Sequence, residues 1–154
     1  MDYLKSGKYQ LIHYAGHTFF DEKNPVESGL VLKGEEILAG HELEEALKIA
    51  NEKVSYHPII YLNSCDASKI KAVKTKEGLE KFEGVSISLI RGGALGCVGN
   101  HWEVEDEAIK ELSINFYKLL LEGIPVGEAL MKARKQIYPK KLQTYCYDDS
   151  KKKK

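Results

Sequence analysis

The sequence predicts an α/β sandwich with a mostly parallel sheet. Two near-continuous apolar runs, 9–16 and 58–64, have the length and composition of strands that are covered on both faces of a parallel sheet. Helical patterns alternate with the strand-like runs, in an order typical of this fold class. The chain has 154 residues, of which 43% are hydrophobic, so it can bury one core, and residues 1–150 form a single predicted domain.

The first part of the domain is predicted to contain a strand, a hairpin and a helix. The strand over 9–16 leads into a loop over 21–28. Two β-prone pieces at 30–32 and 37–39 flank a Lys-Gly-Glu-Glu turn, which predicts a hairpin. Hydrophobic residues over 43–50 then recur at the i, i+3, i+4 and i+7 positions of an amphipathic helix.

The middle of the domain adds two further strands and a helix. The strand over 58–64 is followed by the polar, lysine-rich stretch 66–77, whose composition predicts a surface loop. A second helix is expected over about 79–90, and it ends at the following glycine pair because glycine adopts the left-handed cap conformation. Residues 94–99 are the third predicted buried strand.

Two helices and a last strand complete the predicted elements. Carboxylates over 105–107 favour the positive end of a helix dipole, so the third helix begins there, and it ends at Gly123. Pro125 introduces a fourth helix that runs to about Tyr138. Residues 142–147 are a candidate last strand.

Bulk composition argues against several function classes. The 23 Lys and Arg residues balance 23 Asp and Glu residues, so the net charge does not favour nucleic acid or an anionic membrane. We interpret the lysines at 151–154 as a disordered, solvated tail. No stretch has the roughly 20 apolar residues that span a bilayer, and the amino terminus lacks the apolar core of a signal peptide, so we expect a cytoplasmic protein. Cys65, Cys97 and Cys146 are widely spaced, which argues against a disulfide framework and a cysteine-rich zinc site.

A histidine and a cysteine follow the first two apolar runs. His17 comes directly after the run 9–16, and Cys65 comes directly after the run 58–64. Adjacent parallel strands bring their carboxyl ends to one edge of a sheet, where sites form in open α/β folds. An imidazole and a thiol at that edge have the chemistry of a base and a nucleophile.

Several short motifs in order along the chain resemble those of one family. The motifs are His13-Tyr14-Ala15-Gly16-His17, Ser28-Gly29-Leu30-Val31-Leu32, Leu62-Asn63-Ser64-Cys65, Gly93-Ala94, His101-Trp102-Glu103-Val104-Glu105-Asp106, and Glu128-Ala129-Leu130 with Ala133-Arg134. Together they resemble the motifs of CHAT domains, which are caspase-like cysteine peptidases related to separases and often attached to TPR repeats. The chain is similar to the C-terminal catalytic portion of that family.

The resemblance implies a caspase-like three-layer α/β/α sandwich in which His17 and Cys65 form a catalytic dyad. Their separation is close to the roughly 50-residue interval between the histidine and cysteine of caspases. On this interpretation the Cys65 thiolate attacks the scissile carbonyl and His17 transfers protons. Backbone N–H groups of Thr18 and Cys65 are the candidate oxyanion donors, and no cofactor or metal is implied.

The chain departs from the family pattern at two places. Relatives typically have glycine directly after the catalytic histidine, whereas this chain has Thr18, whose Cβ is expected to crowd the substrate or restrict the backbone. The family's domain also begins well upstream of the histidine strand, so the first one or two strands are expected to be absent. An exposed sheet edge recruits other chains, which predicts a homo-oligomer, a separate subunit that completes the sheet, a TPR-type partner, or a truncated and inactive domain.

Several of these side chains also have a structural interpretation. Free cysteine is commonly interior, so Cys65 taken alone is a small core residue, and Cys97 is expected to be inert. We interpret His13 as a hydrogen-bonded residue of the core or of the surroundings of the dyad. Trp102 either packs or lines a substrate pocket. Asp106 is interpreted as a helix cap or an acidic residue of a first helical turn, and contact with substrate is the lesser alternative.

The sequence allows alternatives for the kind of site, the substrate preference and the function class. A zinc site is a lesser alternative, with its ligands drawn from His13, His17, Cys65 and His101. Acidic groups near the predicted site edge would favour a basic substrate side chain, and they are Asp21, Asp66, Glu103 and Asp106. The three function classes are a cysteine endopeptidase, a catalytically inactive or partner-dependent interaction module, and another acyl-transfer hydrolase that uses the same dyad.

Overall fold

The protein has a mixed α/β structure with two compact units. The structure is a computed structural model, and it describes residues 1–54, 57–74, 78, 80–101 and 104–141. Unit one covers Met1–Glu103 and unit two covers Val104–Lys154. The α/β class and the parallel sheet predicted from the sequence are confirmed, and the elements are consistent with a three-layer sandwich.

Unit one holds all the described strands. Its strands are β1 (Leu11–Ala15), β2 (His17–Phe19), β3 (Gly29–Val31), β4 (Ile37–Ala39), β5 (Ile59–Asn63), β6 (Lys71–Lys74), β7 (Glu80–Glu83) and β8 (Gly96–Val98). Its helices are α1 (Asp2–Lys5), α2 (Gly40–Asn51), α3 (Val85–Arg91) and the 3-10 helix η1 (Pro25–Glu27).

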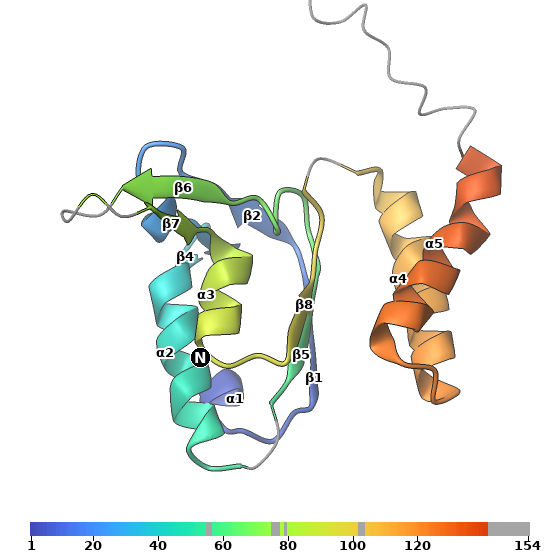
Figure 1. Cartoon of the computed structure of the whole chain (residues 1–154), viewed down its shortest axis with the longest axis horizontal. Coiled ribbons are helices and arrows are strands. Elements are labelled where there is room, and N and C mark those ends of the chain that lie inside the picture. The colour runs from blue at the N-terminus through green and yellow to red at the C-terminus, as the bar shows by residue number, and fades with distance from the viewer. Residues whose placement is uncertain (55–56, 75–77, 79, 102–103, 142–154) are drawn as a thin grey trace, which may run out of the picture. The chain divides into compact units, whose positions relative to one another are not determined.

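The main sheet is parallel, with strand order β1-β5-β8. The carboxyl ends of β1 and β5 are in register, with Ala15 opposite Asn63. Figure 1 shows α1, α2 and α3 on the same face of this sheet. The predicted adjacency of the two apolar runs is therefore confirmed, because both runs contain the strands of one parallel pair.

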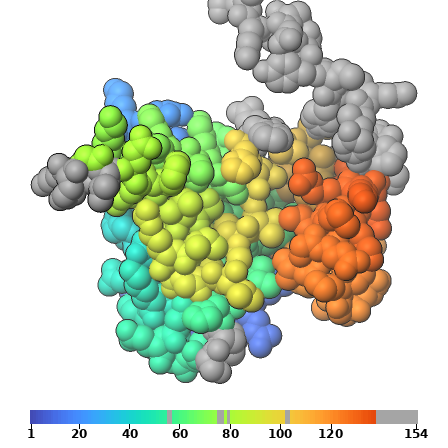
Figure 2. Space-filling view, viewed as in Figure 1, coloured from blue at the N-terminus to red at the C-terminus, as the bar shows by residue number. Residues whose placement is uncertain are grey.

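The core of unit one lies between this sheet and the helices. The surfaces of α2 and α3 adjoin each other in the space-filling view (Figure 2). The largest fully buried hydrophobic side chains of the unit come from α2, α3 and β5, and they are Leu43, Leu47, Leu62, Val85 and Leu89. Within α2, the buried residues Leu43, Ala46, Leu47 and Ala50 follow the helical spacing that the sequence shows over 43–50, so the predicted helix there is confirmed.

The prediction that both apolar runs are buried on both faces is right for β5 and wrong for β1. Residues Ile60 to Leu62 of β5 are fully buried. In β1, only Ile12 and Tyr14 turn toward the core, while Leu11, His13 and Ala15 are exposed. The difference arises because β5 is the central strand and β1 lies at an edge of the described sheet.

A small antiparallel sheet, β2-β3-β4, follows the first strand. The predicted hairpin is confirmed as β3 and β4, which pair with Leu30 opposite Leu38. Strand β2 lies in a segment for which the sequence predicted no element. It begins after Gly16, where the chain leaves the main sheet and pairs with β3 instead.

The predicted loop over 66–77 and the predicted helix over 79–90 are both partly wrong. Strands β6 and β7 pair antiparallel as a hairpin, and helix α3 begins only at Val85. Gly84 separates β7 from α3 with φ of 149°, a backbone angle that side-chain-bearing residues rarely adopt. The predicted glycine stop is confirmed at Gly93, which has φ of 96°.

Unit two is a pair of helices, α4 (Asp106–Leu121) and α5 (Val126–Lys141), that contact each other. Both predicted helices are confirmed, α5 continues past the predicted end, and Gly123 ends α4 with φ of 83°. The candidate strand over 142–147 and the lysine tail lie outside the described residues. Within the described ranges, no helix is long and apolar enough to cross a membrane.

Candidate functional site

His17 and Cys65 both follow the carboxyl ends of paired parallel strands. His17 is the first residue of β2, two positions after β1 ends, and Cys65 stands two positions after β5 ends. The backbone joins the two segments there, because the N–H of Gly16 donates to the carbonyl of Asn63 at 3.2 Å. The imidazole-bearing residue is exposed and the thiol-bearing residue is half-buried.

A side-chain hydrogen bond connects the neighbours of these two residues. The hydroxyl oxygens of Thr18 and Ser64 lie 2.6 Å apart, within the usual range for O–H···O bonds. The side chain of Thr18, which the sequence led us to expect against the substrate, therefore lies toward Ser64. Ser64 is only 3% exposed, so the bond lies largely out of solvent.

The chain turns sharply after Cys65, and Asn100 holds both sides of the turn. Asn100 Nδ2 donates to the Ser64 carbonyl at 3.2 Å, and the Asn100 carbonyl accepts from the N–H of Ser68 at 2.9 Å. Asp66 has φ of 56°, the left-handed conformation in which side-chain-bearing residues are uncommon. Among the described residues, no carbonyl accepts a hydrogen bond from the N–H of Cys65.

The register of the small sheet also leaves the N–H of Thr18 outside the ladder. Hydrogen-bonded and non-bonded pairs alternate along antiparallel strands. Leu32 donates to Glu36 at 2.7 Å and Gly40 donates to Ser28 at 2.8 Å, so Leu30, between them, directs its backbone polar groups toward β4. Thr18 stands opposite Leu30, and its N–H consequently points away from β3.

Tyr14 fixes the bend between β1 and β2. Its hydroxyl lies 2.7 Å from the carbonyl oxygens of both His17 and Val31, and it donates its proton to one or the other. Burial raises the pKa of Tyr14, and the two backbone hydrogen bonds oppose that rise. A Cβ at Gly16 would lie 2.5 Å from this hydroxyl, which explains the glycine directly before His17.

The acidic residues predicted near the site do not form one group in the part of the chain that is described. The Asp21 carboxylate accepts from the N–H groups of Lys23 and Asn24 at 2.8 and 2.9 Å, and these bonds, that with Asn24 first, lower the pKa of Asp21. Asp66 lies in the turn after Cys65, 3.8 Å from the Lys69 ammonium. The predicted pocket residues Trp102 and Glu103 lie outside the described residues. Asp106 is the first residue of α4 in unit two and an acidic residue of its first turn, as one of the sequence-based interpretations had it, while the N-cap position is held by Glu105.

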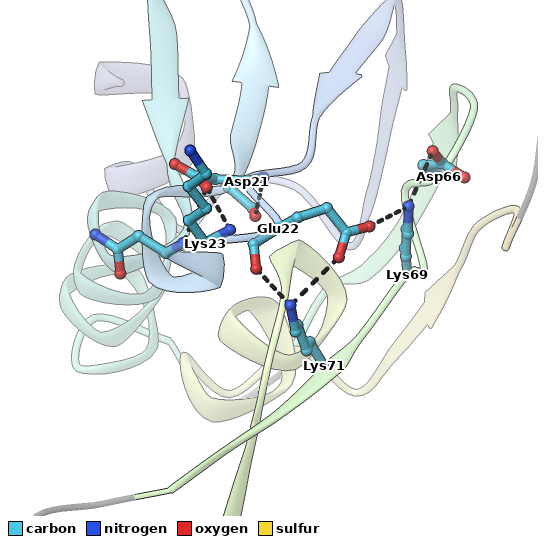
Figure 3. Close-up of polar contacts among 8 residues, drawn as sticks. Asp21, Glu22, Lys23, Asp66, Lys69 and Lys71 are labelled. Atoms are coloured by element: carbon cyan, nitrogen blue, oxygen red, sulfur yellow. Dashed lines mark hydrogen bonds and ion pairs between the residues drawn. The ribbon is translucent and has the colours of Figure 1, made fainter.

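An ionic cluster that the sequence analysis missed lies beside this region. Figure 3 shows the Glu22 carboxylate between two ammonium groups, 2.8 Å from Lys69 and 3.4 Å from Lys71. The hydrogen bond with Lys69 lowers the pKa of Glu22 and raises that of Lys69. The cluster joins the loop after β2 to the segment after the Cys65 turn. Acidic and basic runs in the sequence hint at such pairs, but their partners depend on the tertiary fold.

Three other histidine and cysteine candidates from the sequence are His13, Cys97 and Cys146. His13 is exposed, which corrects its assignment to the core, and its ring stacks on Tyr61 with centroids 5.2 Å apart. Burial raises the pKa of the Cys97 thiol to about 12, so this thiol stays protonated near neutral pH. Cys146 lies outside the described residues. Within the described ranges, no three His, Cys, Asp or Glu side chains gather in a way that would hold a metal ion.

The family model of the CHAT domain matches residues 1–149. The chain belongs to the CHAT domain family. The resemblance seen in the sequence motifs is therefore confirmed, and it places this CHAT domain in a caspase-like, peptidase-related family. No curated protein matches the chain.

Proposed function

We propose that this CHAT domain is a cysteine endopeptidase of the caspase-like type, in which His17 and Cys65 act as a dyad. The observation that carries the proposal is the in-register pairing of β1 with β5, since each dyad residue follows one of these strands at the same edge of the sheet. The exposure of His17 and the partial exposure of Cys65 leave both side chains accessible to a peptide. Cys97, with its pKa near 12, is a poor alternative nucleophile.

Each residue of the dyad has a defined role in the proposed reaction. The Cys65 thiolate attacks the scissile carbonyl carbon and forms a C–S bond, and the carbonyl oxygen becomes an oxyanion. His17 donates a proton to the departing amine as the C–N bond breaks, which leaves a thioester. Water then attacks the thioester while His17 accepts its proton, and the Cys65 thiolate leaves with the release of the carboxylic acid.

Two backbone donors are proposed for the oxyanion. The N–H of Cys65 is adjacent to the nucleophile, and no protein carbonyl among the described residues engages it. The N–H of Thr18 is directed away from the β3 ladder, so strand pairing does not consume it. Donors that are fixed before the reaction stabilise the developing charge without reorganisation.

Covalent labelling tests the dyad directly. A panel of peptide acyloxymethyl ketones, varied at the residue before the scissile bond, is incubated with the wild type, Cys65→Ala and His17→Ala, and adducts are read by intact mass. We expect one adduct on the wild type, none on Cys65→Ala and at least about a hundredfold slower labelling of His17→Ala. Cys97→Ala and His41→Ala are matched controls, because Cys97 is a second half-buried thiol with a raised pKa and His41 is an exposed histidine of α2.

The same panel tests substrate preference. Asp66 immediately follows Cys65, so we propose that its carboxylate favours a basic side chain in the substrate. The nearby Lys69 ammonium opposes this preference, and Asp66→Asn should therefore reduce it severalfold rather than abolish it. Equal labelling by basic and neutral peptides would remove this part of the proposal, and adducts that persist in Cys65→Ala would remove the dyad.

The second candidate is an interaction module that depends on a partner chain. The observation that favours it is the position of β1 at an edge of the described sheet, with Leu11 exposed at 37% and Phe19 of the adjoining β2 at 40%. Edge strands of this kind pair readily with another chain. A folded wild type that is not labelled, together with a dimer or larger species in light scattering, would favour this candidate over the peptidase.

A further inference from the structure

Ser64, the residue directly before the proposed nucleophile, links segments of three strands. The hydroxyl of Ser64 bonds to Thr18 of β2, and its carbonyl accepts from Asn100, which lies two residues beyond β8. Ser64 itself follows β5 and precedes Cys65. We name Thr18, Ser64 and Asn100 the Ser64 clamp.

We propose that the Ser64 clamp is a positioning device that fixes the Cys65 turn relative to His17. This inference rests on the proposed peptidase function. Thr18 and Asn100 are its positioning residues, and neither side chain needs to touch the substrate for the device to work. The clamp includes Thr18, the position at which this chain departs from the family's glycine, so its threonine hydroxyl has no counterpart where glycine occurs.

The clamp constrains the nucleophile from both sides. Asn100 bonds to Ser64 before Cys65 and to Ser68 after it, so the turn is closed between two fixed points. Gly99 lets the two segments approach, because a Cβ there would lie 2.5 Å from the Ser68 hydroxyl. The turn also contains Ala67, which is completely buried and anchors it to the core of unit one.

The clamp constrains the base through the backbone of β2. Thr18 is bonded to His17 in the chain, and the His17 carbonyl is in turn held by the Tyr14 hydroxyl. The Thr18 side-chain bond and the Tyr14 bond to the His17 carbonyl therefore both fix the backbone directly after His17. Misplacement of a reacting group by 1 Å costs about a hundredfold in rate. The bond between Thr18 and Ser64 joins the chain neighbours of His17 and Cys65, so its loss should slow the proposed reaction.

The test compares variants that keep or remove single hydroxyl groups. Thr18→Val keeps the side-chain shape without the hydroxyl, Thr18→Ser keeps the hydroxyl, and Ser64→Ala with Thr18→Val removes both partners. Asn100→Leu tests the other arm of the clamp. Each is measured for folding by circular dichroism and for the rate of labelling by the preferred peptide ketone between pH 5 and 10.

We expect Thr18→Val to label about ten- to a hundredfold more slowly near neutral pH. Thr18→Ser should restore most of the rate, because it keeps the hydroxyl that bonds to Ser64. A purely structural role would lower the folded fraction and leave the labelling rate of the folded molecules unchanged.

The double variant separates positioning from stability. A buried hydroxyl without a partner costs stability, so Thr18→Val alone leaves Ser64 unsatisfied, and removal of both hydroxyls should recover folding but not labelling. Wild-type labelling rates in folded Thr18→Val and Asn100→Leu would refute the clamp while leaving the dyad intact. A wild type that is never labelled would instead refute the proposed function on which the clamp rests.

Discussion

Replacement of Gly16 by alanine is expected to destabilise the bend that carries His17. A Cβ at this position would lie 2.5 Å from the Tyr14 hydroxyl and 2.8 Å from its Cζ atom, distances that real Cβ contacts do not show. The tyrosine ring must therefore move, and its hydroxyl loses the carbonyls of His17 and Val31, each now at 2.7 Å. The clash is steric, since Gly16 does not have a positive φ.

The magnitude follows from three opposing contributions. Overpacking of a filled site costs about 1–3 kcal/mol. Loss of the tyrosine hydrogen bond costs about 1 kcal/mol more, because the single hydroxyl proton makes one bond at a time. Alanine restricts the unfolded chain and returns about 0.4–1 kcal/mol. The net loss of unfolding free energy is about 1–3.5 kcal/mol, which lowers the urea midpoint by about 1 M at a typical m-value.

Urea unfolding followed by circular dichroism measures this change. Gly96→Ala is the matched control in unit one, because no atom of the described residues lies within 4 Å of a Cβ built at Gly96. Tyr14→Phe and the double variant with Gly16→Ala complete a cycle in which we expect at least about 0.5 kcal/mol of coupling. A Gly16→Ala midpoint equal to that of Gly96→Ala, or additive behaviour in the cycle, would refute the steric argument.

Three further predictions concern other side chains. The Arg91 guanidinium lies 2.7 Å from the carboxylate of Glu83, a residue that is only 2% exposed. Arg91→Ala should therefore lower the unfolding free energy measured in urea by up to about 3 kcal/mol. An unchanged free energy would contradict burial of that charge. A disulfide reagent at pH 8 should modify Cys65 in the folded protein. It should modify Cys97, whose pKa is raised to about 12, only after unfolding. Equal modification rates of the two thiols in the native state would contradict this difference in reactivity. Although His13 is exposed overall, partial desolvation of its ring lowers its pKa below 6.5. The unfolded state therefore binds more protons between the two pKa values, and stability should fall as pH falls below 6.5. His13→Gln should flatten that slope in unfolding measured from pH 7.5 to 5, and an unchanged slope would exclude His13 as its source.

The strands and helices with strong local patterns were predictable from the sequence. The amphipathic repeat over 43–50 and the glycine stop at Gly123 are local signals, and both features are present. The error over 79–90 has a physical cause. Apolar spacing there fits a helix, yet Phe82 is 53% exposed on the β6–β7 hairpin, and pairing with the preceding strand β6 overrides the helical preference.

The candidate site was predictable only in outline. The positions of His17 and Cys65 after apolar runs indicated one sheet edge, because chain order and strand type determine where parallel strands end. Which strand is central is not a local property, so the exposed face of β1 was missed. The contacts of Thr18 with Ser64 depend on how β2 bends away from the sheet, and no sequence pattern specifies that bend.

The departure at Thr18 shows how a residue beside the proposed dyad becomes part of the structure around it. A threonine hydroxyl in a half-buried position needs a hydrogen-bond partner, and Ser64, almost fully buried, needs one as well. Each hydroxyl satisfies the other, so removal of one is expected to cost more than its own hydrogen bond, because it leaves the other without a partner. Thr18→Gly should therefore cost more stability in the wild type than in Ser64→Ala, because only the wild type is left with an unsatisfied buried hydroxyl. Urea unfolding of the four variants measures this difference, and equal costs in both backgrounds would mean that water or another group satisfies Ser64.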